Sequence, residues 1–245
     1  MAFSTQLMHS LENENTRSMF PTCTGASVVA LVYKDGVIVA ADRQVSYGKM
    51  ARYGGYSRIY QVNSCTMLAF SGDHADFQYL QNRLELKMSE YKAECSDPEA
   101  ELSPKAVHSW LTWILYYRRC RINPLSNTLV VFGVQGKEKQ PFLGHVNLRG
   151  VAYNNEYLAT GFGLVLLQQT LENAYREHCG PDKSSQMTRE QAEQLLMKCV
   201  ELVWYRDCTA TNEFEIAVVT AEGCQTGQPQ KMVGNWDVAD YVVGY

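Results

Sequence analysis

Residues 26–42, ASVVALVYKDGVIVAAD, constrain the fold of this chain more than any other segment. Two apolar runs, 26–33 and 37–41, flank the turn Lys34-Asp35-Gly36, and the second run ends in Ala-Ala-Asp. An Asp-Gly pair between runs rich in β-branched residues is a strong local signal for a β-hairpin. We therefore predict a hairpin at 26–42, and a fold that contains a sheet.

The composition is that of a protein with a buried core. The 245 residues are 46% apolar, and we expect a single domain over 26–245, preceded by a polar extension at 1–25 that lies outside the fold. The net charge of −4 argues against nucleic acid or an acidic membrane as the main partner. No run approaches the roughly 20 apolar residues of a membrane span, and the eight scattered cysteines are expected to be free thiols.

The order of the expected elements defines the fold class. Ser103-Pro104 and Thr188 with Gln191 are helix start signals, because Ser and Thr cap helices and Pro suits the first turn. Beyond the first hairpin, strands are expected at 59–62, 66–70, 128–134, 141–147, 152–159 and 213–220, and helices at 74–94, 104–121, 164–180 and 188–207. Strands and helix pairs in alternation predict an α+β fold, in which sheets are covered by helices on both faces.

The hairpin at 26–42 resembles the N-terminal hairpin of the proteasome β subunits, which are N-terminal-nucleophile hydrolases. The resemblance runs from Thr24 to the C-terminus, and it is carried by the following segments: TGASVV (24–29), VIVAAD (37–42), SGDHADFQYL (71–80), HSWLT (108–112), NPLSNTLVV (123–131), FLGHVNLRGVAY (142–153), LATGFG (158–163), YRD (205–207) and NWDVADYVVGY (235–245).

This resemblance implies a four-layer α-β-β-α sandwich of two antiparallel sheets. It also implies a place in the 20S core particle, in the cytoplasm and the nucleus, with the other β subunits of its ring, the α ring and the opposite β ring as partners. The particle would serve ubiquitin-dependent protein degradation, and no cofactor or metal is implied.

The residues at the family's catalytic positions imply a subunit without hydrolytic activity of its own. Active members cleave a Gly-Thr bond, and the freed Thr attacks the peptide carbonyl with the help of a Lys. Here the bond is Gly25-Ala26, and a methyl group cannot attack a carbonyl. The Lys position falls on Arg58, which does not replace a tunable amine. The degenerate site therefore consists of Ala26, Asp42, Arg58, Phe162, Asp207 and Ala210, where Phe162 and Ala210 stand at the positions of two family serines.

Other interpretations stay open at this point. Thr24 or Cys23 would be a nucleophile if the chain were cut just before it, although this register displaces the Gly36 turn and Asp42. A free-standing binding module on the same fold is a third possibility. Asp42 could pair with Arg58, and Asp207 could cap or pair at the end of the fourth helix.

Two apolar features favour assembly over a lone monomer. Trp110, Trp113, Tyr116 and Tyr117 form an aromatic stripe on the second expected helix. The weakly charged stretch 236–243 would aggregate unless it docked on another surface.

Overall fold

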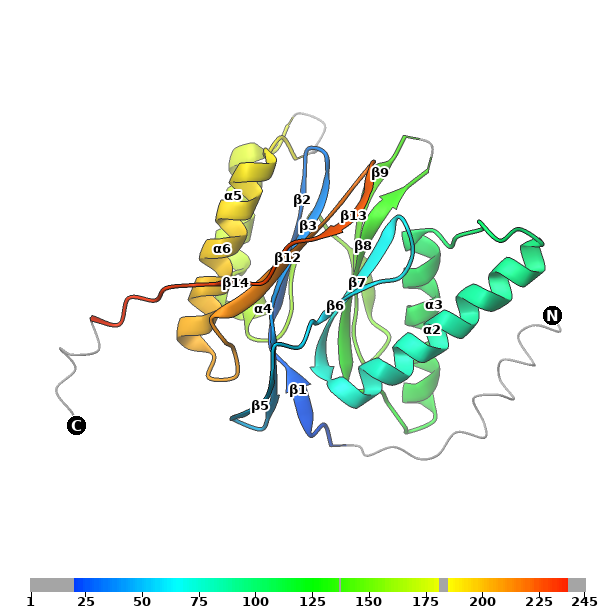
Figure 1. Cartoon of the computed structure of the whole chain (residues 1–245), viewed down its shortest axis with the longest axis horizontal. Helices are drawn as coiled ribbons and strands as arrows, with labels where there is room; N and C mark the ends of the chain where they lie inside the picture. Colours follow the sequence, from blue (N-terminus) through cyan, green and yellow to red (C-terminus); the bar gives the residue numbers. More distant parts are fainter. Residues whose placement is uncertain (1–19, 137, 181–184, 238–245) are drawn as a thin grey trace.

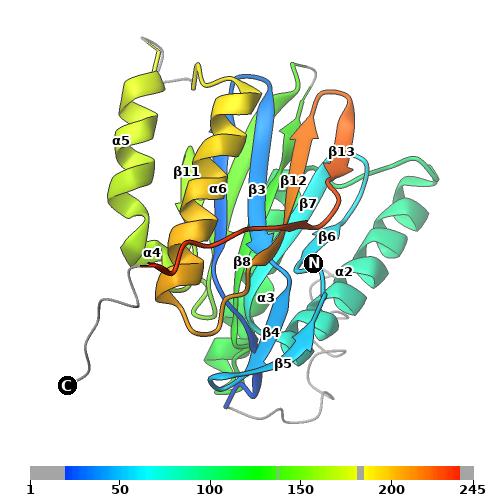
Figure 2. The same cartoon turned by 60° about the vertical axis from the view of Figure 1, so that its left-hand side comes forward.

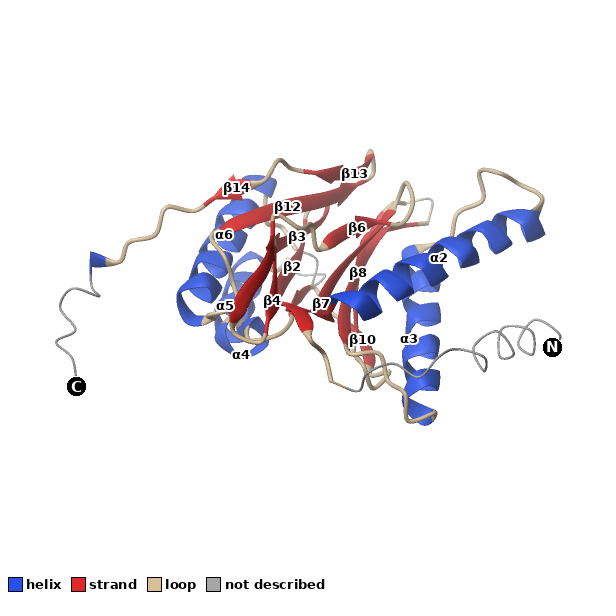
Figure 3. Cartoon of the chain, turned by 60° about the horizontal axis from the view of Figure 1, so that its bottom comes forward, coloured by secondary structure: helices blue, strands red, loops and turns tan. Residues whose placement is uncertain are grey.

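Two antiparallel sheets, packed face to face between two layers of helices, make up the fold (Figure 1). A computed structural model of the chain describes residues 20–136, 138–180 and 185–237. The expected four-layer sandwich is confirmed, and Figure 3 shows both sheets edge-on between the helices.

The eight strands of the first sheet, sheet A, are β1 (Cys23–Gly25), β4 (Gln44–Tyr47), β5 (Met50–Gly54), β6 (Ile59–Gln61), β7 (Thr66–Asp73), β8 (Asn127–Gln135), β9 (Gln140–Val146) and β10 (Ala152–Asn154). The six strands of sheet B are β2 (Val28–Tyr33), β3 (Gly36–Asp42), β11 (Tyr157–Ala159), β12 (Glu213–Thr220), β13 (Gly223–Thr226) and β14 (Gln230–Lys231). The helices are α2 (His74–Cys95), α3 (Pro104–Cys120), α4 (Gly163–Leu166), α5 (Gln168–His178) and α6 (Arg189–Arg206).

The β2–β3 hairpin forms as predicted, and both of its faces are buried. Side chains alternate across a strand, so a strand that is covered on both faces is apolar throughout. In β2, Val28, Ala30 and Val32 enter the core between the two sheets. Val29, Leu31 and Tyr33 enter the core between sheet B and the helices α5 and α6. A third core joins sheet A to α2 and α3.

The helix start signals are confirmed by the caps that the structure forms. The Thr188 hydroxyl accepts a hydrogen bond from the Gln191 backbone, and the Gln191 side chain accepts one from the Thr188 backbone, which completes a capping box. Ser103 caps α3 by accepting from the amide of Ala106. These caps fix where the helices begin and hence which faces they turn to the sheets.

Sheet A has the strand order β10-β9-β8-β7-β1-β4-β5, so β1 lies inside the sheet. Thr24 pairs with Ser46 of β4 on one side and with Asp73 of β7 on the other. Residues 23–25 therefore belong to the fold, and the expectation that the extension reaches residue 25 is wrong. Figure 2 shows β4 and β5 below the body of the sheets.

Three further expectations about the elements are corrected. The single strand expected at 152–159 is two strands, since β10 joins sheet A and β11 joins sheet B. The helix expected at 164–180 is divided into α4 and α5 at Leu167. Strands β4 and β5 were not expected, and every residue of β5 is exposed. The C-terminal stretch from residue 238 onward lies outside the described residues.

Candidate functional site

Arg58 is the centre of the candidate site, and its side chain is completely buried. A guanidinium carries five N–H donors, and each of them has an acceptor here. Nε donates to the Asp42 carbonyl at 2.9 Å, and Nη1 donates to the carbonyls of Ala26 at 2.9 Å and Phe70 at 3.0 Å. Nη2 donates to the Ser27 carbonyl at 2.7 Å and to Oδ1 of Asp42. Arg58 thus joins the link between β1 and β2 to the end of β3 and to β7.

Asp42 forms the ion pair with Arg58 that the sequence left open. Its side chain is only 4% exposed. Burial raises the pKa of Asp42 above its usual value, while the positive charge of Arg58 acts to lower it. A buried carboxylate without such a partner would be costly, so the pair holds the end of β3 in place.

Ala26 follows strand β1 and is buried, and its backbone carbonyl accepts a hydrogen bond from the guanidinium of Arg58. The backbone fits closely here: a Cβ on Gly25 would lie 2.7 Å from Cδ of Arg58. Only glycine therefore fits before Ala26 while Arg58 keeps its position. The Ala26 methyl offers no donor, acceptor or nucleophile, and the Ala26 carbonyl is already bound.

Phe162 does not enter the site, because its side chain is 64% exposed. The backbone of the next residue does contact the site, since the amide of Gly163 donates to the Ser27 hydroxyl at 2.9 Å. Thr160 accepts a hydrogen bond from the Val28 amide at 2.8 Å and bonds the Ser71 hydroxyl. Ser27 and Thr160 were missed by the sequence analysis, and their only signal was their closeness to motifs that it did single out.

Asp207 lies at the C-terminal cap of α6, as one of its expected roles required. Its carboxylate accepts hydrogen bonds from the amide of Thr209 at 2.9 Å and from the hydroxyl of Thr209 at 2.7 Å. The Asp207 charge contributes to the raised pKa of Asp42, so the two carboxyl groups face the same region. Ala210 follows in this loop and packs against the core beneath sheet B.

A cavity of about 10 Å³ remains at this place, and its lining includes Ser27, Asp42, Ala210 and Thr211. That volume is close to the minimum for one water molecule. The structure thus brings together Ala26, Asp42 and Arg58, sets Ala210 at the same cavity as Asp42, and leaves the Phe162 side chain in solvent. No substrate-sized space lies between these groups within the described ranges 20–136, 138–180 and 185–237.

Thr24, the alternative nucleophile, lies in the middle of β1 and is hydrogen-bonded into the sheet through both of its neighbours. The Arg58 donors reach the carbonyls of Ala26 and Ser27, one and two residues beyond Gly25. The structure therefore centres the site on Ala26.

A metal-binding cluster and a membrane-spanning helix are both absent from the part of the chain that the structure describes. Within it, no group of three or more His, Cys, Asp or Glu side chains is placed to hold a metal ion. None of the described helices is long and apolar enough to cross a bilayer.

Comparison with known proteins agrees with this fold. Residues 22–219 match the family described as proteasome subunit, and the chain belongs to that family. Among its members, the chain is similar to proteasome subunit beta type-4 of Xenopus laevis, with 39% identity over 92% of this chain and 89% of the relative. Proteasome subunit beta type-4 of Drosophila melanogaster is 38% identical over 91% of this chain and 80% of the relative. Proteasome subunit beta type-7 of Saccharomyces cerevisiae is 32% identical over 100% of this chain and 92% of the relative. The chain is thus a β-type subunit like beta type-4.

Proposed function

We propose that this chain is a non-catalytic β subunit of the 20S proteasome core, at the seventh position of the β ring. It supports ring assembly and helps to enclose the chamber in which other subunits cut proteins marked by ubiquitin. Its partners are the neighbouring β subunits, the α ring and the opposite β ring, in the cytoplasm and the nucleus.

One observation carries the non-catalytic assignment. At the place of the nucleophile stands Ala26, and the cation behind it, Arg58, uses every donor on groups of this chain. A catalytic amine must lower the pKa of a neighbouring hydroxyl and exchange protons, whereas a guanidinium stays protonated. The Arg58 side chain therefore suits a structural role.

The strand before Ala26 supports the same proposal. An extended peptide binds a sheet by using the free backbone groups of a strand edge. Strand β1 already uses the facing edges of β4 and β7. A peptide could bind there only by displacing residues 23–25 of the chain itself.

Intact-mass spectrometry of the native particle, after exposure to a threonine-reactive epoxyketone, tests the proposal. We expect catalytic subunits to gain the adduct and this chain to keep its unmodified mass. An adduct on this chain would overturn the proposal. The variant Thr24→Ala then serves as the control, because loss of the adduct in it would identify Thr24 as the nucleophile.

A further inference from the structure

Positive charge is concentrated in one part of this acidic chain. Residues 102–155 contain seven Lys and Arg residues and one acidic residue, Glu138, which gives a net charge of +6. The remaining residues carry −10, since the whole chain has −4. The segment comprises α3 and the strands β8, β9 and β10.

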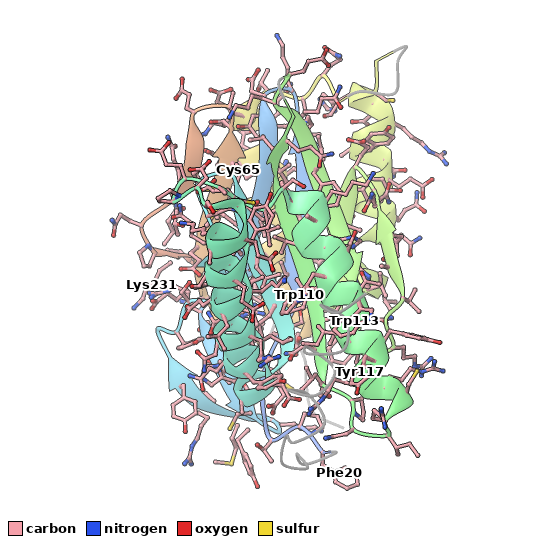
Figure 4. All side chains as sticks on the ribbon, turned by 90° about the vertical axis from the view of Figure 1, so that its right-hand side faces the viewer. Phe20, Cys65, Trp110, Trp113, Tyr117 and Lys231 are labelled. Carbon is pink, nitrogen blue, oxygen red and sulfur yellow. The ribbon has the colours of Figure 1, made fainter. Side chains whose placement is uncertain are left out.

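Several exposed residues of this segment lie near the C-terminal end of α3 and in the turn that packs on it. The turn between β9 and β10 packs directly on the helix: a Cβ on Gly150 would lie 2.6 Å from Cβ of Tyr116 and 2.9 Å from its Cα. We define the α3 patch by the exposed residues that this contact brings together, which are Tyr116, Arg119, Ile122, Leu148, Arg149 and Val151. Figure 4 faces α3, along which Trp110, Trp113 and Tyr117 are labelled.

The α3 patch is both apolar and cationic. Ile122 is 77% exposed and Val151 is 53% exposed. Isolated exposed apolar residues are ordinary, whereas a contiguous group indicates an interaction site. The Arg119 guanidinium lies over the Tyr116 ring, 5.8 Å from its centroid, so an arginine and a tyrosine are presented together. Arg and Tyr are enriched among the residues that dominate protein interfaces.

The two arginines of the patch have no acidic partner in the part of the chain that the structure describes. Across the described residues, neither Arg119 nor Arg149 makes an ion pair. Nearby Asp76 is buried, and its carboxylate accepts a hydrogen bond from the amide of Ser126. The charges of Arg119 and Arg149 are therefore available to a partner.

We propose that the α3 patch binds an acidic face of a neighbouring proteasome subunit, in which carboxylates meet Arg119 and Arg149 and aliphatic side chains meet Ile122 and Val151. This inference rests on the proposed place of the chain in the particle. Complementary charge across an interface selects the correct neighbour and speeds association. The mixture of two free arginines with three aliphatic side chains suits a protein face better than a phosphate backbone, which favours denser positive charge.

Charge reversal tests the patch. Arg119→Glu with Arg149→Glu is compared with Lys34→Glu with Lys139→Glu, which makes the same charge change at exposed turns outside the α3 patch. Each tagged variant is expressed beside the unaltered chain, and its share of purified 20S particles is measured by mass spectrometry. We expect at least a tenfold loss for the patch variant and less than a twofold change for the control. Equal incorporation of both variants would overturn the inference.

Cross-linking identifies the partner without relying on a loss of assembly. Arg119→Lys with Arg149→Lys keeps the charge but adds amines, which a carbodiimide joins to carboxylates in contact. We expect cross-links from position 119 or 149 to an Asp or Glu of another subunit in the intact particle. Cross-links only within this chain, only to a second copy of it, or none at all would overturn the inference, as would binding of a polynucleotide that needs both arginines. If the unaltered chain itself were absent from 20S particles, the proposed function would fail instead.

Discussion

Replacing Arg58 by methionine should strongly destabilise this protein, because the guanidinium binds four carbonyls and one carboxylate in a fully buried place. Methionine retains much of the apolar volume but provides no donor. Removing one partner of a buried ion pair costs about 3–5 kcal/mol, and each buried acceptor left without a donor adds about 1–3 kcal/mol. These terms are not additive, so we expect a loss of about 4–6 kcal/mol in the free energy of unfolding. Such a loss is comparable to the whole stability of many domains.

The loss of stability in Arg58→Met should also depend on pH, which a simple packing defect would not. Without Arg58, the pKa of Asp42 should rise further, because burial raises it and the opposing charge is gone. A carboxyl group with a folded-state pKa above its unfolded value stabilises the fold at low pH and loses that contribution as the pH rises. The defect of Arg58→Met should therefore be smaller at pH 4 than at pH 7, and adding Asp42→Asn should recover part of it at pH 7.

The assay is urea unfolding of the full-length chain, followed by circular dichroism at both pH values. Arg52→Met is the matched control, since Arg52 lies on the exposed strand β5, and it should change stability by no more than about 0.5 kcal/mol. A cost below about 1 kcal/mol for Arg58→Met would refute the reasoning. So would a defect of equal size at both pH values.

Three further predictions concern other parts of the chain. Thr188→Ala removes one half of the capping box of α6 and should cost about 1 kcal/mol in urea unfolding; no loss would mean that the cap is redundant. Burial, together with the neighbouring His108, lowers the pKa of His145 to about 4. Since an unfolded histidine has a pKa near 6.5, His145 contributes stability above that pH that is lost as the pH falls toward 4. Lowering the pH from 7 to 5 should cost about 1–2 kcal/mol, and His145→Phe should reduce this slope; an unchanged slope would exclude His145 as its source. Finally, the isolated chain should not cut its own Gly25-Ala26 bond, because Ala26 has no hydroxyl; a new N-terminus at residue 26 in the unassembled chain, found by mass spectrometry, would contradict this.

Much of the fold was predictable from local signals. The Asp-Gly turn and the apolar runs defined the β2–β3 hairpin, and Thr188 marked the start of α6. Strand β5 could not be found in the same way, since it is exposed throughout and has no alternation of apolar and polar residues, and β4 is only four residues long. The division of 152–159 between two sheets depends on contacts with strands far away in sequence, which no local pattern reveals.

The candidate site was predictable in its residues but only partly in its contacts. The hairpin register located Ala26 and Asp42, and the resemblance pointed to Arg58. Arg58 binds four carbonyls because the tertiary structure brings their segments together around it. Every residue has a backbone carbonyl, so the sequence does not indicate which carbonyls will accept these hydrogen bonds. The exposure of Phe162 was likewise not predictable, because it depends on how the turn packs on the rest of the fold.

Strand β1 has a consequence for producing this protein. Among the described strands of sheet A, β4 and β5 connect to the others only through β1. A recombinant version that began at Ala26 would leave the backbone N–H and C=O groups on the facing edges of β4 and β7 unpaired. Unpaired strand edges form hydrogen bonds with strands of other chains. Truncation at this bond should therefore yield a product that associates with itself in solution, so an expression plasmid should retain the codons for residues 20–25.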